Sequence, residues 1–498
     1  MLSLQFYGGH YEIGGTKLLL RTDEGQVFLE FGKSFETEGR FFEEPWNPPF
    51  HIPSLLSVGA LPELPGMYRT DSAAPPVNGI IISHAHQDHG GCVPFVAPGI
   101  PVYVGADTRN LMEIRTETGQ SKWSTDDGHV DWRRFRTGDE ITVEGSDIRF
   151  RPIHVDHSVP ASYGFVLEAA GKRIGYTGDI RMHGRRSQMT ADFLAALREK
   201  PLDVLICEGT RLHPPQGDDD DDLRQRMEGI YRERMGEAAP EIVRKDCERE
   251  EDVERELTRV IGGSEGLVLV EVSPIDLDRM YTVWRAASAA GRTLVIPAKQ
   301  AYMLEEGARR TAIQDLVPPS DTVLFMAQRK KDKRTLTTGE PEDAESMAFY
   351  KWEKALAEKW EAAGSAVLWG LEGRAELREN GRKYVICAPQ VVYILPELCY
   401  RAQPCKIDFI LSKSEPFNEE MVFSFDKLLN WLAFFNCRRY YQIHVSGHAS
   451  PADLRRIIEE ANPTTLVPVH TKHPEMFQGR HDRLLIPSHT AGEPLVIG

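Results

Sequence analysis

Four residues of the types that bind metal ions lie within six consecutive positions, 84–89, which read His-Ala-His-Gln-Asp-His. An apolar run precedes them and two glycines follow, a pattern typical of a buried strand that ends in a turn beside a cleft. In an extended strand His84 and His86 point to the same side and suit one ion. Asp88 and His89 lie on the turn and could reach a second ion. A polar loop with three histidines by chance is the alternative, but this density of zinc-type ligands favours a metal site.

Four residues cannot complete two coordination shells, so further ligands are expected downstream. Three later segments place a ligand-type residue after a strand-like run. Residues 154–160 read His-Val-Asp-His-Ser-Val-Pro, residues 175–181 read Gly-Tyr-Thr-Gly-Asp-Ile-Arg, and residues 466–472 read Leu-Val-Pro-Val-His-Thr-Lys. Each segment is weak evidence alone, because a single histidine at a strand end is more often a surface or structural residue. Together with the hexapeptide they indicate one site assembled at the ends of several strands.

This set of segments resembles the metallo-β-lactamase superfamily, and the final strand-end histidine narrows the resemblance to its β-CASP nuclease branch. The resemblance implies two zinc ions. The implied ligands are His84, His86 and His157 for the first ion, Asp88, His89 and His470 for the second, and Asp179 as a bridge. His157 is chosen because it begins the family segment H-S-[IV]-P. His154 and Asp156 are interpreted as supporting or structural residues.

The β-CASP branch adds two motifs outside the metal ligands. Glu208 matches its acidic residue at a strand end, and His448 matches the histidine of its S-G-H-[AG]-S segment. Within the branch the chain is most similar to the ribonuclease J family, over 444–470, the glycine-rich segment 7–15 and the strand-helix-strand segment 268–296. The resemblance implies that His448 donates a proton to the leaving oxygen and that Glu208 orients it. Without the resemblance, Glu208 could equally be an exposed carboxylate at a strand end and His448 a histidine at the start of a helix.

A substrate phosphate is expected to contact His444, Ser446 and Gly447, together with the backbone amides of the helix that Pro451 opens. His444 could equally be a structural histidine of a strand.

Several positions depart from the family pattern. Glu30 stands where the family has Asp, Ala161 where an acidic residue is common, and Thr471 where a glycine follows the last histidine. Segment 41–76 is an unusual proline-rich insertion. None of these changes removes an implied metal ligand.

All seven implied ligands are His or Asp and none is Cys, which indicates a catalytic site and not a closed structural one. Two ions about 3.5–4 Å apart can activate a water molecule and stabilise the charge that develops on a phosphodiester. We therefore expect two zinc ions, with manganese as the alternative. The catalytic residues expected are Asp88, Asp179, Glu208 and His448.

Composition sets limits on location. The chain has 498 residues, which allows two to four domains. No apolar run approaches the ~20 residues that span a bilayer, and no basic segment followed by an apolar one opens the chain. The seven cysteines include no C-x-x-C pair, which indicates reduced thiols. A cytoplasmic protein without a membrane partner is expected, and a homo-oligomer is an open alternative.

The net charge of −16 would repel a polyanion as a whole, so binding of nucleic acid must depend on local positive surface and on the metals. Three basic segments are candidates, at 132–136, 329–334 and 438–441. The first and third interleave basic and aromatic residues, as base stacking with phosphate contact would require. For each segment, an ordinary solvated face is the alternative and the more frequent case.

Hydrophobic patterning predicts the architecture. Short strand-like runs dominate to about residue 206 and return after 403, whereas 211–402 alternates strands with helices, which indicates a parallel sheet covered by helices. We expect an α/β protein: a metallo-β-lactamase αββα sandwich in two parts, 1–210 and 403–498, with an inserted β-CASP domain at 211–402. The acidic run 218–222 and the segment 328–346 are expected to be surface loops.

The leading functional hypothesis is a dizinc ribonuclease that cuts single-stranded RNA as an endonuclease, with 5′-to-3′ exonuclease action as a further activity. A DNA-processing β-CASP nuclease is the first alternative, because fold alone does not choose the substrate. A hydrolase of small esters, lactams or thioesters would need neither Glu208 nor His448. A catalytically silent scaffold is disfavoured by the intact set of ligands.

Overall fold

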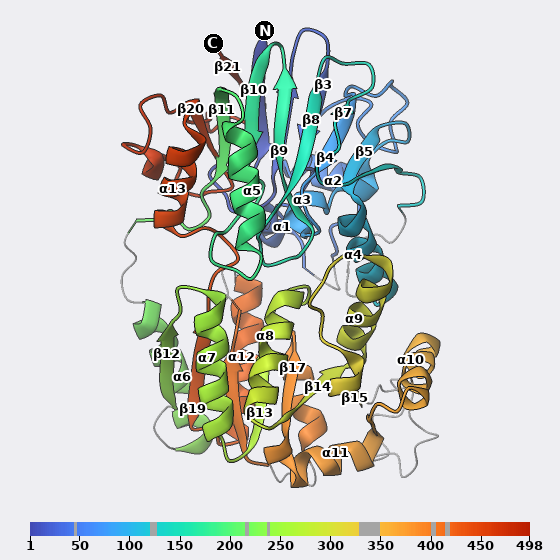
Figure 1. The fold of residues 1–498 in the computed structure, drawn as a ribbon, viewed down its shortest axis with the longest axis vertical. Helices are drawn as coiled ribbons and strands as arrows, with labels where there is room; N and C mark the ends of the chain where they lie inside the picture. The colour runs from blue at the N-terminus through green and yellow to red at the C-terminus, as the bar shows by residue number, and fades with distance from the viewer. Residues whose placement is uncertain are drawn as a thin grey trace. The chain divides into compact units, whose positions relative to one another are not determined.

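The computed structural model describes residues 1–43, 47–119, 127–214, 219–236, 240–327, 349–399, 405–413 and 419–498. The chain forms two compact units (Figure 1). Unit 1 contains residues 1–216 and 447–498, and unit 2 contains residues 217–446. Among the described residues, no helix has both the length and the apolar character needed to cross a membrane.

Unit 1 is built on two sheets. The seven-stranded sheet has the order β21-β1-β2-β3-β4-β5-β6, and the six-stranded sheet has the order β20-β11-β10-β9-β8-β7. The strands of the first sheet are β1 (Leu2–Gly8), β2 (Lys17–Arg21), β3 (Gln26–Leu29), β4 (Gly79–Ile82), β5 (Pro101–Gly105), β6 (Asp131–Phe135) and β21 (Pro494–Ile497). Those of the second are β7 (Ile141–Thr142), β8 (Arg149–Val155), β9 (Ser162–Ala169), β10 (Lys172–Tyr176), β11 (Leu202–Glu208) and β20 (Pro463–Val469).

The inner faces of these two sheets share one apolar core, in which Phe6 and Leu18 of the first sheet join Phe165 and Leu167 of the second. Helices cover the outer faces. The helices of unit 1 are α1 (Phe35–Phe41), α2 (Ile52–Ser57), α3 (Gln87–Gly90), α4 (Ala106–Glu117), α5 (Ser187–Arg198) and α13 (Pro451–Ala461). Helices α5 and α13 pack on the second sheet (Figure 1). Two sheets between layers of helices confirm the αββα sandwich expected from the sequence.

The proline-rich insertion at 41–76 has a packing role in unit 1. Leu55 of α2 and the buried Met67 and Tyr68 join the apolar cluster on the outer face of the first sheet. The Tyr68 hydroxyl donates a hydrogen bond to the Pro62 carbonyl at 2.6 Å. Within its described part, the insertion therefore covers one face of the sandwich.

Unit 2 contains an eight-stranded sheet with the order β12-β19-β18-β13-β17-β14-β15-β16. Every pairing between its neighbouring strands is parallel. The strands are β12 (Glu241–Asp246), β13 (Leu267–Glu271), β14 (Thr293–Pro297), β15 (Thr322–Met326), β16 (Val367–Trp369), β17 (Tyr384–Ala388), β18 (Ile407–Leu411) and β19 (Arg439–His444).

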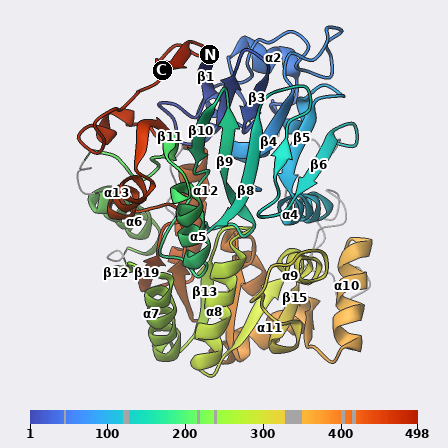
Figure 2. The same ribbon diagram turned by 45° about the horizontal axis from the view of Figure 1, so that its top comes forward.

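Helices cover both faces of this parallel sheet, which explains why its central strands are continuous apolar runs. They are α6 (Asp219–Met235), α7 (Glu250–Gly263), α8 (Leu277–Ala289), α9 (Ala298–Arg310), α10 (Lys351–Ala362), α11 (Gly370–Glu379) and α12 (Glu419–Phe434). Helices α7 and α8 lie side by side on one face (Figure 2), and α6 and α12 contribute Tyr231 and Leu429 to the core on the other. The inserted α/β fold is thus the one expected.

The chain passes back from unit 2 to unit 1 at a different residue from the one expected. The sequence placed it at 402/403, but the structure places it after Ser446. Strand β18 pairs with β13, and β19 pairs with both β18 and β12, so these two strands complete the sheet of unit 2. Buried apolar strands look alike in either unit, so the sequence pattern could not identify their partners.

The acidic run 218–222 was interpreted as a loop, but α6 begins at Asp219. Acidic residues are favoured in the first turn of a helix because they face its positive dipole end, so a polar run does not exclude a helix start. Asp218 and segment 328–346, including the basic run 329–334, lie outside the described residues.

Candidate metal centre

The first group of candidate ligands lies where β4 ends. His84 and His157 are buried, and with His86 and Asp179 they bring one ligand atom each within 4.8 Å of one another. His84 Nε2 lies 2.9 Å and His157 Nε2 lies 3.2 Å from His86 Nδ1. The Nδ1 of His157 donates to the carbonyl of Gly447 at 2.7 Å, which leaves the lone pair on the Nε2 that faces the group. These side chains can bind one ion together.

Asp88, His89 and His470 form a second group whose ligand atoms also lie within 4.8 Å of one another. Short helix α3 carries the first two, and His470 follows β20. His470 Nε2 lies 3.2 Å from Asp88 Oδ2. Asp179 lies between the groups, with Oδ2 at 3.2 Å from His89 Nε2 and 3.6 Å from His84 Nε2. All seven residues expected as ligands are therefore brought together in unit 1.

Several polar atoms in this cluster have no hydrogen-bond partner among the described residues. They are Asp179 Oδ1 and both ring nitrogens of His89. A buried carboxylate without a hydrogen bond is costly unless a cation is near it. Carboxylate and imidazole together are a donor set that zinc accepts. The residues thus fit bound divalent ions.

Glu30, which replaces the expected aspartate after β3, still serves the second group. Its Oε1 lies 3.4 Å from His89 Nδ1, and its carboxylate accepts hydrogen bonds from the Ser83 amide at 3.1 Å and the Tyr176 hydroxyl at 3.3 Å. The Glu30 backbone is left-handed, with φ of 63°. This uncommon conformation accompanies a longer side chain that still reaches the histidine. The departure from the family pattern therefore leaves the support of His89 in place.

A glycine-rich loop between β1 and β2 supports Asp88 from the other side. A Cβ atom on Gly14 of this loop would lie 2.8 Å from Asp88 Oδ2. A Cβ atom on Gly32, which follows β3, would lie 1.6 Å from the Asp88 carbonyl oxygen. Both positions therefore require glycine. Glu12 fixes the loop, because its carboxylate accepts from the Gly9 amide at 3.1 Å and from the Ser34 hydroxyl at 2.7 Å. The sequence did not identify Glu12 or Ser34, and its only signal was the density of glycines.

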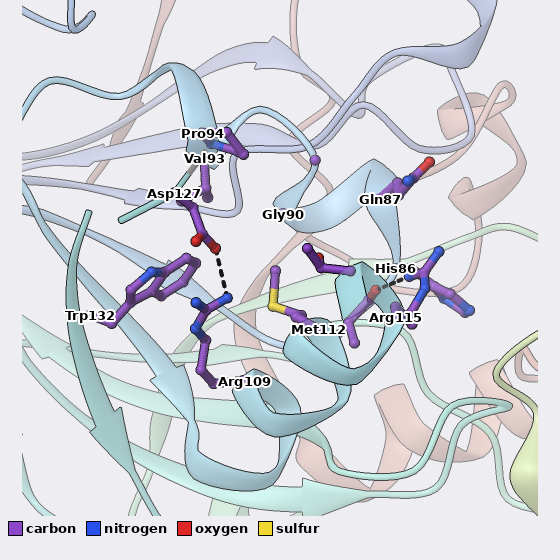
Figure 3. A pocket seen from close by; sticks show the side chains of 13 residues that line it. His86, Gln87, Gly90, Val93, Pro94, Arg109, Met112, Arg115, Asp127 and Trp132 are labelled. Atoms are coloured by element: carbon purple, nitrogen blue, oxygen red, sulfur yellow. Dashed lines mark hydrogen bonds and ion pairs between the residues drawn. The ribbon is translucent and has the colours of Figure 1, made fainter. Parts of the chain in front are cut away.

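Arg115 of α4 supports the turn that carries His86 (Figure 3). Its Nη1 donates to the Ala85 carbonyl at 2.8 Å. Supporting residues of this kind typically change metal affinity by about 10–100-fold when they are replaced. We expect Arg115→Met to weaken binding of the first ion by about tenfold, as measured by competition with a chromogenic chelator. The exposed Arg133, replaced by Met in the same way, is the control, and equal affinities for the two variants would show that Arg115 has no such role.

The cavity beside Arg115 is too small for a nucleotide. It has a volume of about 50 Å³, whereas ligand pockets usually measure about 300–1,000 Å³. Arg109 crosses it, paired with Asp127 at 2.8 Å and lying over the Trp132 ring at 4.2 Å (Figure 3). Such a space suits a few water molecules. This cavity is therefore not the place where a nucleotide would bind.

Glu208 and His448 lie together beside the metal ligands of unit 1. His448 Nδ1 is 3.2 Å from Glu208 Oε1 and 3.9 Å from Asp179 Oδ2. Glu208 is fully buried and also accepts from the Ile180 amide at 3.0 Å. Burial alone would lower the pKa of His448, but the charges of Glu208 and Asp179 outweigh it and raise that pKa to about 9. His448 can therefore carry a proton next to the ions.

The three residues expected to contact a substrate phosphate do not all belong to the same unit. Gly447 is at the centre, where its carbonyl accepts from His157. His444 and Ser446 belong to unit 2, where Arg279 Nη1 lies 3.1 Å from His444 Nδ1.

The amino end of α13 is already capped. The Ser450 hydroxyl accepts from the Asp453 amide, and the Asp453 carboxylate accepts from the Ser450 amide. An acidic side chain at this end disfavours a phosphate there, in contrast to the expectation from the sequence.

The supporting residues of segment 154–160 lie outside both ligand groups. The ring of His154 is 4.3 Å from that of Tyr163, and burial lowers its pKa to about 4. Asp156 is buried and pairs with Arg181 Nε at 3.0 Å. Both therefore have partners within the fold of unit 1.

Two of the three basic segments are described, and neither is a free positive surface. In 132–136, Arg133 pairs with Asp131 and Arg134 with Glu113. In 438–441, Tyr440 is buried and Arg439 lies 3.5 Å from Glu241. These contacts favour the interpretation as ordinary charged faces.

The two ligand groups should respond differently to pH. Burial lowers the pKa values of His84 and His157 well below the usual range and that of His86 to about 4. Burial also opposes charge on His89, but Asp179, Asp88 and Glu30 outweigh it and raise its pKa. At neutral pH the first group is therefore ready to bind an ion, whereas His89 must first lose a proton.

We expect the affinity for the second ion to rise up to about tenfold per pH unit below the raised pKa of His89. Affinity for the first ion should stay nearly constant above about pH 5, because its histidines are already neutral there. Zinc titration calorimetry of the metal-free protein at pH 6 and pH 8, in buffers of different ionisation enthalpy, measures the protons released. Equal proton release for both ions would contradict this assignment.

Comparison with known proteins agrees with the fold and with metal binding. Residues 52–241 match the model of the "Beta-lactamase superfamily domain", and residues 435–478 match the "Zn-dependent metallo-hydrolase RNA specificity domain". Ribonuclease J of Sinorhizobium meliloti is 22% identical over 82% of this chain and 61% of its own length. An RNase J-like protein of Methanocaldococcus jannaschii is 28% identical over 42% of this chain and 43% of its own length.

This chain therefore spans about three fifths of the length of the Sinorhizobium relative. A crystal structure of a protein of unknown function from Enterococcus faecalis shares the fold, with a TM-score of 0.67 and 19% identity over 99% of both chains. The matched domains, the relatives and the strand-end cluster of histidines and aspartates agree with one another. The chain thus contains a match to the beta-lactamase superfamily domain and is similar to β-CASP proteins of the ribonuclease J type.

Proposed function

We propose that this protein is a metal-dependent ribonuclease that hydrolyses phosphodiester bonds of single-stranded RNA, as an endonuclease and as a 5′-to-3′ exonuclease. The observation that carries the proposal is the pairing of His448 with Glu208 at 3.2 Å beside Asp179. A hydrolase of small esters or lactams would not need this pair. The matched RNA specificity domain and the ribonuclease J relatives support RNA as the substrate.

The two ligand groups would hold two zinc ions, with manganese as the alternative. His84, His86 and His157 would bind the first ion, Asp88, His89 and His470 the second, and Asp179 both. When bound, such a pair of ions supplies a nucleophilic water at neutral pH and stabilises the charge on the attacked phosphate. The protein contributes fixed ligand positions, because Gly447, Glu30 and the loop at 9–15 hold the histidines and Asp88 in place.

His448 would protonate the oxygen that leaves the phosphorus. Its Nδ1 faces Glu208, so the proton would pass to the substrate from the other ring nitrogen, Nε2. Burial opposes ionisation of Glu208, but the charge and hydrogen bond of His448 outweigh it and lower the pKa of that carboxyl. The ionised Glu208 would hold the imidazole in one orientation and favour its protonated form.

His444, Ser446 and Gly447 remain our proposed contacts to a substrate phosphate. A guanidinium can only donate hydrogen bonds, so the contact of Arg279 with His444 Nδ1 makes that nitrogen an acceptor. A substrate phosphate would therefore be contacted through the other ring nitrogen, Nε2. Arg279 is itself held by Glu250 at 2.7 Å and 2.9 Å.

Cleavage assays with matched oligonucleotides test the proposal. Single-stranded RNA and DNA of the same sequence, each with a 5′ monophosphate or a 5′ hydroxyl, would be incubated with purified protein and zinc or manganese. We expect cleavage of RNA, with internal fragments from endonuclease action and nucleotides released from the 5′ end by exonuclease action. Cleavage of DNA alone would assign the protein to DNA processing, and cleavage of neither would contradict nuclease activity.

A further inference from the structure

Two aromatic rings from opposite ends of the chain stack on each other in unit 1. The ring centroids of Tyr11 and His489 are 3.6 Å apart, with an angle of 21° between the planes. The Tyr11 hydroxyl donates to the Pro487 carbonyl at 3.2 Å, which fixes the ring. His489 is exposed and Tyr11 is partly exposed. The pair therefore presents a flat aromatic surface to solvent.

Tyr11 has a backbone conformation that disfavours its own side chain. Its φ is 55°, in the left-handed region where a bulky residue is strained and glycine is not. Folding alone would favour glycine at this position. Strain of this kind persists where the surroundings enforce it, and it is concentrated at binding and catalytic sites. His470 is also left-handed, with φ of 53°.

The ring pair is tied to the second group of metal ligands. Thr471, which follows His470, forms isolated backbone bridges with His10 and Glu12, the two neighbours of Tyr11. The His470 amide also donates to the Gly9 carbonyl at 2.5 Å. One residue further, Lys472 has a half-exposed side chain whose Nζ lies 3.5 Å from Glu36. A flat aromatic surface and a cation thus lie within a few residues of a candidate metal ligand.

We propose that Tyr11 and His489 form a stacking subsite for one base of the single-stranded RNA. The proposal rests on the proposed ribonuclease function. Aromatic rings bind any base through its face, so the subsite would position the strand without selecting its sequence. Lys472 pairs with Glu36 at 3.5 Å and would exchange this partner for a neighbouring phosphate when the strand binds. The strained Tyr11 is then retained for binding and not for stability.

Three variants separate this role from simple packing. Tyr11→Gly removes the ring and relieves the strain, Tyr11→Phe retains the ring, and His489→Ala removes the other ring. Loss of one base stack weakens binding by roughly tenfold or more. We expect Tyr11→Gly and His489→Ala to raise KM for single-stranded RNA about tenfold with kcat nearly unchanged, and Tyr11→Phe to resemble the wild type. The melting temperature of Tyr11→Gly should not fall.

A set of RNA oligonucleotides, each with one abasic nucleotide, locates the stacked base. We expect the wild type to lose affinity at one abasic position and Tyr11→Gly to be insensitive there. RNA cleavage with the same KM in all variants, or a lower melting temperature of Tyr11→Gly with unchanged KM, would overturn the subsite and leave the ribonuclease function standing. A wild type that neither binds nor cleaves RNA would overturn both.

Discussion

Asp88→Ala should nearly abolish cleavage of RNA and remove one of the two metal ions while the protein remains folded. The Asp88 carboxylate is 3.2 Å from His470 Nε2 and 3.7 Å from His89 Nε2, so its loss leaves the second group with two side chains of its own. A bound ion contributes several kcal/mol to the stabilisation of transition-state charge. The cleavage rate should therefore fall by about a thousandfold or more.

The fold should survive this change because the backbone of residue 88 holds the turn. The Asp88 carbonyl accepts from the Thr16 amide at 3.1 Å, and alanine keeps that bond. Cleavage rate, metal content by inductively coupled plasma mass spectrometry, and melting temperature should be compared with those of Asp482→Ala, which replaces an exposed aspartate. Undiminished cleavage by Asp88→Ala would mean that the second group takes no part in the reaction.

His448→Ala should slow cleavage by about 10²–10⁴-fold, the usual contribution of a positioned general acid. Both ions should remain bound, because the expected task of His448 is proton transfer. If Glu208 acts through His448, then Glu208→Gln should also slow cleavage, and the double variant should be little slower than His448→Ala alone. Single-turnover rates and metal content measure these effects.

His213→Ala is the matched control for this series, because His213 is exposed in the same unit. The ligand atoms of Asp179, His448 and His470 lie within 4.8 Å of one another, so a role of His448 as a ligand can be tested directly. Loss of an ion from His448→Ala would make it a ligand and not an acid. If the effects of the two substitutions on the cleavage rate add fully in the double variant, Glu208 and His448 act independently.

The candidate centre could be largely predicted from the sequence because its ligands are local signals. Residues 84–89 place four residues of ligand type, three His and one Asp, at the end of one buried strand. Strand-end patterns pointed to three downstream segments, but the choice of His157, Asp179 and His470 as ligands and their assignment to two ions came from the family resemblance.

What the sequence did not reveal depends on contacts between distant segments. Glu12 fixes the glycine-rich loop by accepting from the Gly9 amide and the Ser34 hydroxyl, and Arg115 donates to the Ala85 carbonyl; such contacts leave no motif. The membership of β18 and β19 in unit 2 depends on strand pairing, and either unit could have accepted such apolar strands. The left-handed backbone of Tyr11 is equally invisible, because residue type alone predicts the opposite.

The most direct test of a two-ion ribonuclease is restoration of activity to metal-free protein. The protein would be stripped with a chelator and dialysed, and zinc would then be added stepwise while bound zinc per chain and the rate of single-stranded RNA cleavage are measured together. We expect little cleavage at one ion per chain and a steep rise as the second ion binds. Full activity of the metal-free protein, or full activity at one ion, would contradict the account.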